Sequence, residues 1–92
     1  MRKPATPNPQ THDPVLIHLL TILRKRRKAL GLSQLALGQN VARTQAWVSK
    51  IEKGQQLMNI LEFFRVCGAL ELPPERLIKS LRHSLGFPSK RK

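Results

Sequence analysis

The chain has 92 residues, a formal net charge of +12, and only five acidic residues against 17 Lys and Arg. This length allows one small domain, and the absence of regular strand alternation leaves an all-α fold as the class that fits. Because self-repulsion at this charge density costs stability, a polyanion is the natural partner. Nucleic acid is the first candidate, an anionic membrane surface the second and an acidic protein the third.

The start of the chain predicts an arm followed by a helix. Residues 1–12 carry prolines among polar residues, a composition typical of a flexible basic arm. Asp13 is a good N-cap and Pro14 suits the first helical position, so a helix is expected from here. Leucines recur at helical spacing as far as Leu30, and Gly31 is expected to end this helix.

The stretch from Ser33 to Gly54 predicts two short helices joined by a tight turn. Ser33 and Thr44 are good N-caps, and Gly54 takes a left-handed C-terminal conformation at low cost. The helices are expected at about 34–39 and 45–52, with a turn of about four residues between them. Two helices joined this tightly form a helix-turn-helix, whose second helix enters the DNA major groove.

The second of these helices has two faces of different character. At about 100° per residue, Trp47, Val48 and Ile51 lie on one side and can pack against a domain. The other side is small, polar and basic, and consists of Gln45, Ala46, Ser49, Lys50 and Lys53. Most such faces are only solvated, but the two N-caps, the turn length and the basic chain favour a DNA-reading helix here.

Two further helices and a tail complete the predicted chain. Asn59 and Glu62 form a capping box, and the strongly apolar run that follows is expected to be the core helix. The last helix is expected from Pro73 to about Leu85. Its apolar stripe has to close the domain, and any surplus would form a dimer surface. Residues 87–92 form a short basic tail.

Three stretches carry a specific pattern, namely GLSQ at 31–34, TQAWVSKIEKG at 44–54 and NILEFFRVCGAL at 59–70. They resemble the helix-turn-helix region of the Cro/phage-repressor (XRE) family. The resemblance implies a compact five-helix, lambda-repressor-like DNA-binding domain over residues 13–86, with the helix-turn-helix at helices 2 and 3.

Two residues depart from the pattern of that family. Gly38 stands where the family usually has Ala, and it is expected to lower the stability of its helix by up to about 1 kcal/mol. Ala42 stands where the family usually has Gly, so the turn has to adopt a geometry that tolerates a Cβ. The turn is accordingly the part of the motif that the pattern predicts least well.

A groove-reading helix needs base contacts and phosphate contacts, which use different chemistry. For bases, Gln45 can bond bidentately to adenine N6 and N7, Ser49 can reach a base edge, and the Ala46 methyl can meet a thymine methyl. The candidate phosphate contacts are Gln34, Arg43, Lys50 and Lys53. The family resemblance implies DNA contacts at positions 34, 45, 46, 49 and 50. It also implies an ion pair between Arg27 and Glu52 that ties the first helix to the recognition helix.

The function implied by the resemblance is repression by a homodimer that occupies a palindromic operator, including the promoter of its own gene. An antitoxin that neutralises a partner protein and also binds its own promoter is one alternative. A nonspecific nucleic-acid binder that uses charge alone is another. A membrane-surface role for residues 15–28 as a basic amphipathic helix leaves the pattern at 33–54 unexplained.

No catalytic, metal or cofactor site is predicted. Cys67 is the single cysteine, which excludes an intramolecular disulfide, fits a reducing cytoplasm and suits a buried small hydrophobe. The histidines are scattered, with no Cys or carboxylate at ligand spacing. The apolar run at 15–23 is too short to span a bilayer. With five acids and no evident nucleophile–base pair, we expect a cytoplasmic binding protein and not an enzyme.

Overall fold

The computed structural model describes residues 13–86, so the predicted arm at 1–12 and tail at 87–92 lie outside the described residues. The helices are α1 (Pro14–Ala29), α2 (Gln34–Asn40), α3 (Gln45–Glu52), α4 (Ile60–Ala69) and α5 (Pro74–Leu81). Over the described range these five helices are the only regular elements. The predicted all-α, five-helix fold with a helix-turn-helix at α2 and α3 is therefore confirmed.

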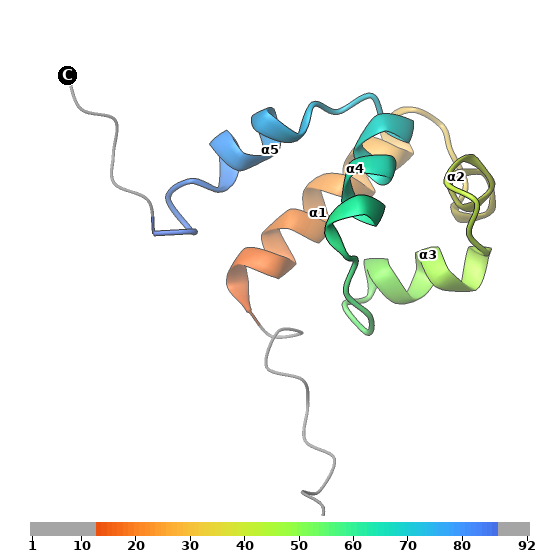
Figure 1. The fold of residues 1–92 in the computed structure, drawn as a ribbon, viewed down its shortest axis with the longest axis horizontal. Helices are drawn as coiled ribbons and strands as arrows, with labels where there is room; N and C mark the ends of the chain where they lie inside the picture. The colour runs from red at the N-terminus through yellow and green to blue at the C-terminus, as the bar shows by residue number, and fades with distance from the viewer. Residues whose placement is uncertain (1–12, 87–92) are drawn as a thin grey trace, which may run out of the picture.

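The helices are arranged around α1, which contacts both α3 and α5. In Figure 1, α2 and α3 lie on one side of α1 and α4, and α5 lies on the other side. α2 packs against α3 and also contacts α4. This arrangement leaves α3 at one edge of the molecule, away from α5 (Figure 1).

All five helices contribute to one core. Its buried members are Leu20, Leu23, Leu37, Val41, Val48, Ile51, Val66, Cys67, Leu70, Leu72 and Leu77. Burial raises the pKa of the Cys67 thiol, because a thiolate is poorly solvated there. The prediction that Cys67 is a buried small side chain is confirmed.

The predicted N-caps are all present as hydrogen bonds. The Asp13 carboxylate accepts from the Val15 backbone N–H at 2.7 Å, and the Ser33 hydroxyl accepts from its helix at 3.0 Å. Thr44 caps α3 in the same way at 3.0 Å. Asn59 and Glu62 form the reciprocal capping box of α4. Each cap satisfies a backbone donor that the helix itself leaves unpaired, which is why local sequence predicted these starts well.

Four helices, α1 to α4, end in the same hydrogen-bonded turn, in which one residue has a positive φ. Gly31 and Gly54 occupy this position after α1 and α3, with φ of 74° and 75°. Ala42 and Glu71 occupy it after α2 and α4, with φ of 58° and 54°. This conformation costs an L-residue about 1 kcal/mol or more, so backbone strain lies within the helix-turn-helix turn itself.

Gly38 packs closely against the backbone that leads from α2 into α3. A Cβ on Gly38 would lie 2.8 Å from the carbonyl oxygen of Arg43 and 3.0 Å from that of Thr44. The Gly38 carbonyl also accepts a 2.8 Å hydrogen bond from the Arg43 backbone N–H. The lower helix propensity of Gly38 stays a prediction, but its missing side chain also lets the backbone leading into α3 approach α2 closely.

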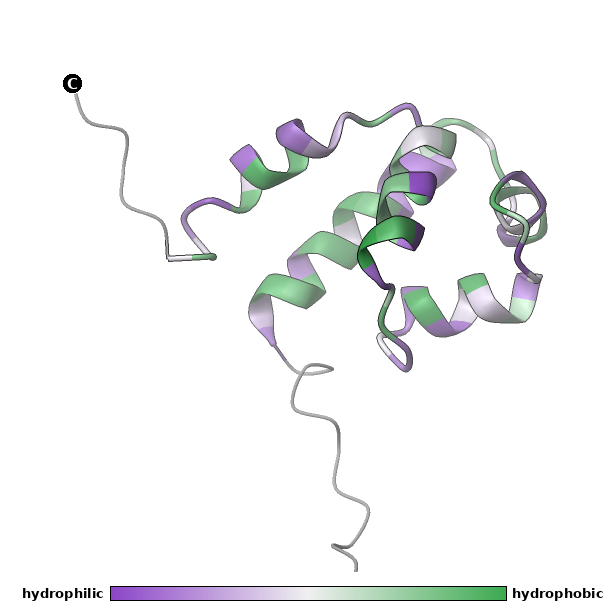
Figure 2. Cartoon of the chain, viewed as in Figure 1, coloured by the Kyte–Doolittle hydropathy of each residue, from purple (hydrophilic) through white to green (hydrophobic). Residues whose placement is uncertain are grey.

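The expectation that α4 is the core helix was correct only for its second half. Val66 and Cys67 are buried, with 4% and 1% of their surfaces exposed. Ile60, Leu61 and Phe64 are 61%, 60% and 48% exposed. Figure 2 shows the first half of α4 as strongly hydrophobic although much of it faces solvent. Composition identified an apolar helix, but the packing of α4 decides which of its residues are covered.

The last helix is shorter than predicted. α5 ends at Leu81, four residues before the expected end at Leu85. Leu77 and Leu81 are buried, whereas Leu85 is 41% exposed, so a further helical turn would gain less from burial of its apolar side chain. Among residues 13–86, no helix is both long enough and apolar enough to cross a membrane.

Candidate nucleic-acid interface

The recognition helix α3 sits on the domain through its apolar side. Val48 and Ile51 are buried, with 2% and 5% of their surfaces exposed. The opposite side is open: Gln45, Ala46, Lys50 and Lys53 are exposed and Ser49 is half-buried. Trp47 lies half-buried against the core cluster. The structure therefore presents the predicted polar and basic residues of α3 together on one accessible face.

A buried ion pair anchors α3 to α1. Arg27 Nε donates to Glu52 Oε2 at 2.6 Å, and Arg27 Nη2 donates to Glu52 Oε1 at 3.1 Å. The two side chains are only 8% and 9% exposed. Arg27 Nη1 also donates to the Leu32 carbonyl at 2.7 Å. A buried charge pair is tolerated when its hydrogen bonds are satisfied, so this pair gives α3 a defined position on α1.

Gln34 continues this network toward the exposed end of α3. Its Nε2 donates to Glu52 Oε1 at 3.0 Å, and its Oε1 accepts from Gln45 Nε2 at 2.7 Å. Gln34 was expected only as a phosphate contact, and its links to Glu52 and Gln45 were missed. The one sequence signal was the seven-residue spacing of Gln45 and Glu52, which places both on one helix face.

Arg43 lies in the turn and is held by two protein groups. Its Nη2 donates to Glu62 Oε2 at 2.8 Å, and its guanidinium carbon lies 5.5 Å from the centroid of the Trp47 ring. The backbone N–H of Asn59, with Arg43 beside it, holds the pKa of the Glu62 carboxyl below its usual value. The contact between Arg43 and Glu62 joins residues 19 positions apart and was not predicted.

The comparison with protein families agrees with this geometry. A family model described as a helix-turn-helix domain matches residues 18–81, which extend from the second turn of α1 to the end of α5. The chain belongs to this helix-turn-helix family. A search of curated proteins found no match. Helix-turn-helix domains place their second helix in the DNA major groove, so DNA binding is the function that the family supports.

In this helix-turn-helix domain the acidic groups beside α3 are already paired. Glu52 is neutralised by Arg27 and Glu62 by Arg43. Lys50 is exposed on the recognition helix itself. These two acids therefore do not offset the charges of the exposed Lys50 and Lys53, which favours binding to a polyanion.

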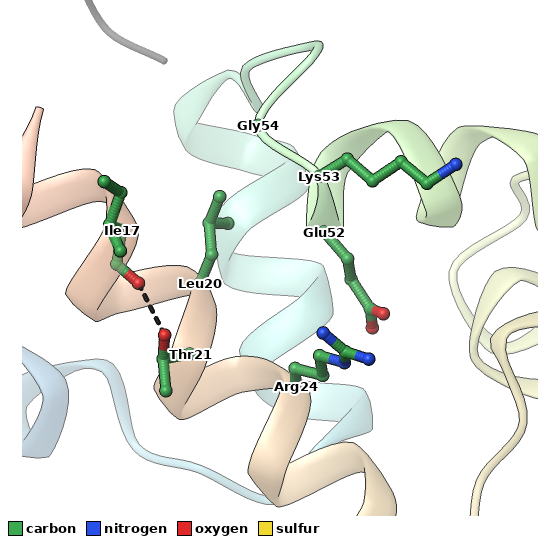
Figure 3. Close-up of a pocket in the computed structure, with 7 residues that line it drawn as sticks. All are labelled: Ile17, Leu20, Thr21, Arg24, Glu52, Lys53 and Gly54. Carbon is green, nitrogen blue, oxygen red and sulfur yellow. Dashed lines mark hydrogen bonds between the residues drawn. The ribbon is translucent and has the colours of Figure 1, made fainter. Parts of the chain in front are cut away.

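A small cleft lies between α1 and the end of α3 (Figure 3). It has a volume of about 210 Å³ and is lined by Ile17, Leu20, Thr21, Arg24, Glu52, Lys53 and Gly54. Figure 3 shows the Arg24 guanidinium directed toward the Glu52 carboxylate, whereas Lys53 extends away from the cleft. Arg24 of α1 thus lies beside the end of α3.

Proposed function

We propose that this helix-turn-helix domain is a sequence-specific double-stranded DNA-binding protein of the Cro/phage-repressor type and represses transcription. The observation that carries the proposal is the exposed polar face of α3, which the buried Arg27–Glu52 pair and the apolar contacts of Val48 and Ile51 hold rigidly. A rigid helix that offers donors and acceptors outward is what base reading in the major groove needs.

The proposed contacts are of two kinds: contacts that read base edges and contacts that bind phosphates and position the protein on the DNA. Gln45, Ala46 and Ser49 read base edges, because their side chains are short or carry a carboxamide at the start of the helix. Lys50 and Lys53 bind phosphates as exposed cations. Arg43 donates to Glu62 through Nη2 and keeps further guanidinium N–H donors for a phosphate, and Gln34 keeps one amide hydrogen beyond the one given to Glu52.

We further propose that the protein binds a palindromic operator as a homodimer. One eight-residue recognition helix covers only a few base pairs, and two-fold dimers solve this by reading half-sites about 34 Å apart. The exposed apolar side chains of Ile60, Leu61 and Phe64, all in the first half of α4, support a contact between two copies. Clustered exposed apolar residues are typical of protein interfaces.

The test is a binding titration with the DNA upstream of the protein's own gene, in excess random competitor at near-physiological salt. Footprinting should reveal a protected palindrome. Gln45→Ala should weaken binding to that site by about 1–3 kcal/mol. Gln39→Ala is the matched control, because Gln39 is exposed and lines a different cleft with residues of α4. Equal affinity for random DNA, unchanged by Gln45→Ala, would instead identify a nonspecific nucleic-acid binder.

A further inference from the structure

The Arg43 side chain is held in place although 36% of it is exposed. Its Nη2 donates to Glu62 Oε2 at 2.8 Å, and its guanidinium carbon lies 5.5 Å from the centroid of the Trp47 ring. Its Nη1 makes a longer bond, of 3.4 Å, to the Ala42 carbonyl. The backbone N–H of Arg43 donates to the Gly38 carbonyl at 2.8 Å. An arginine on an open surface has many rotamers, and here a carboxylate, an aromatic ring and the turn restrict them.

Glu62 is a fixed anchor for this arginine because the capping box of α4 sets its own position. Glu62 Oε1 accepts from the Asn59 backbone N–H at 2.9 Å, and the Glu62 backbone N–H donates to Asn59 Oδ1 at 2.7 Å. Each carboxylate oxygen thus has its own partner, the cap for Oε1 and the arginine for Oε2. Only 14% of the Glu62 side chain is exposed, so the less exposed partner holds the more exposed one.

The anchored guanidinium keeps donors for a ligand. A guanidinium has five N–H donors in a planar fork. One is given to Glu62 and one to the Ala42 carbonyl, so the others remain available to an acceptor. Paired N–H groups of this kind match the oxygens of a phosphate. Gln45, the first residue of α3, lies two positions after Arg43, so the ligand that fits is a phosphate beside the start of the recognition helix.

We propose that Glu62 and Trp47 are positioning residues that hold the Arg43 guanidinium in the conformation in which it binds a DNA phosphate at the start of α3. The inference rests on the proposed function, because it requires the helix-turn-helix to bind DNA. A freely rotating arginine loses entropy when it binds, whereas a side chain that is already ordered in the free protein avoids most of this cost. Because phosphate contacts carry no sequence information, the effect is the same for operator and random DNA.

The contribution of Arg43 to binding reports this positioning, whereas the total affinity does not. The negative charge of Glu62 by itself opposes binding to DNA of any sequence. An anchor makes Arg43 contribute more to binding, and a competitor for its N–H groups makes it contribute less. A double-mutant cycle separates these two cases, because it measures the contribution of Arg43 with and without Glu62.

The experiment measures the affinity of the full chain for a random-sequence duplex and for the DNA upstream of its own gene, over a range of salt concentrations. The cycle consists of the wild type, Arg43→Gln, Glu62→Gln and the double variant. Glu62→Gln keeps an oxygen for the Asn59 N–H, so it retains the cap of α4. A second cycle uses Trp47→Leu in place of Glu62→Gln. A control cycle uses Glu75→Gln, which removes the same charge from the exposed start of α5. Circular dichroism establishes that each variant is folded.

The expected result is a coupling between Arg43 and each of its two neighbours. In the wild-type background, Arg43→Gln should lower the slope of log K against log salt concentration by about 0.9. It should weaken binding to both duplexes by about two- to tenfold more in that background than in the Glu62→Gln or Trp47→Leu background. In the Glu75→Gln background, Arg43→Gln should weaken binding as much as in the wild type.

Other results would overturn the inference. Equal losses in all backgrounds would show that neither neighbour positions Arg43, and a larger loss in the Glu62→Gln background would make Glu62 a competitor of the phosphate. If Glu62→Gln does not fold, the Trp47→Leu cycle decides in the same way. Failure of the proposed function has a different signature: equal affinity of the wild type for both duplexes would refute sequence-specific binding, while the cycle on the random duplex would still test the positioning of Arg43.

Discussion

Local helix propensity and tertiary packing predict opposite effects for one substitution at Gly38. In an exposed helix, replacing Gly by Ala stabilises by about 1 kcal/mol. In this domain the new Cβ would lie 2.8 Å from the Arg43 carbonyl oxygen and 3.0 Å from the Thr44 carbonyl oxygen. Both are backbone atoms at the start of α3, and forcing a methyl group into such a packed contact costs about 1–3 kcal/mol. We therefore expect Gly38→Ala to destabilise the domain by up to about 2 kcal/mol.

Urea and thermal unfolding followed by circular dichroism measure this effect. In a domain of this size, 1 kcal/mol shifts the Tm by about 4–8 °C, so Gly38→Ala should lower it by up to about 15 °C. Gly68→Ala on α4 is the matched control, because a Cβ there meets nothing within 4 Å. It should stabilise the domain by up to about 1 kcal/mol. Equal stabilisation by both substitutions would refute the argument from close backbone approach.

The strained turn allows a second measurement on the same contact. Ala42 has a φ of 58°, a conformation that glycine adopts without penalty. Adding Ala42→Gly to Gly38→Ala restores the residue pair of the family that the sequence resembles, and lets the turn relax away from the added methyl group. The double variant should therefore be less destabilised than Gly38→Ala alone, and a strictly additive result would contradict this coupling.

Three further effects are expected from charged residues. Arg27→Met leaves a buried carboxylate without its cation, so it should lower the free energy of unfolding in urea by about 3–5 kcal/mol. Lys50→Gln should reduce the slope of log K against log salt concentration by about 0.9 in a DNA titration, whereas Lys79→Gln on α5 should leave the slope unchanged. The bond from the Asn59 backbone N–H and the contact with Arg43 lower the pKa of Glu62, so both stabilise the fold above the ordinary pKa of 4.5, and this contribution is lost as the pH falls through the lower pKa of the folded state. Stability curves of the wild type and Glu62→Gln should therefore converge on acidification, and a constant difference between pH 7 and pH 3 would contradict this assignment.

Features that depend on neighbouring residues were predictable from the sequence. The N-caps at Asp13, Ser33, Thr44 and Asn59 bond to backbone groups two or three residues away, so residue type and spacing suffice to place them. The same holds for the two faces of α3, because helical periodicity alone separates Val48 and Ile51 from the polar side. These local rules were enough to identify the helix-turn-helix and its recognition helix.

Features that depend on packing between distant segments required the tertiary structure. The bonds of Gln34 to Glu52 and of Arg43 to Glu62 join residues 18 and 19 positions apart, and no local pattern specifies them. The sequence shows that Ile60 is apolar, but it does not show whether another helix covers this side chain in the fold. Gly38 likewise acquires its role only where the backbone entering α3 meets α2. Local chemistry thus determined where the helices begin and which face of α3 is exposed, whereas contacts between helices decided how the exposed side chains of α3 are held.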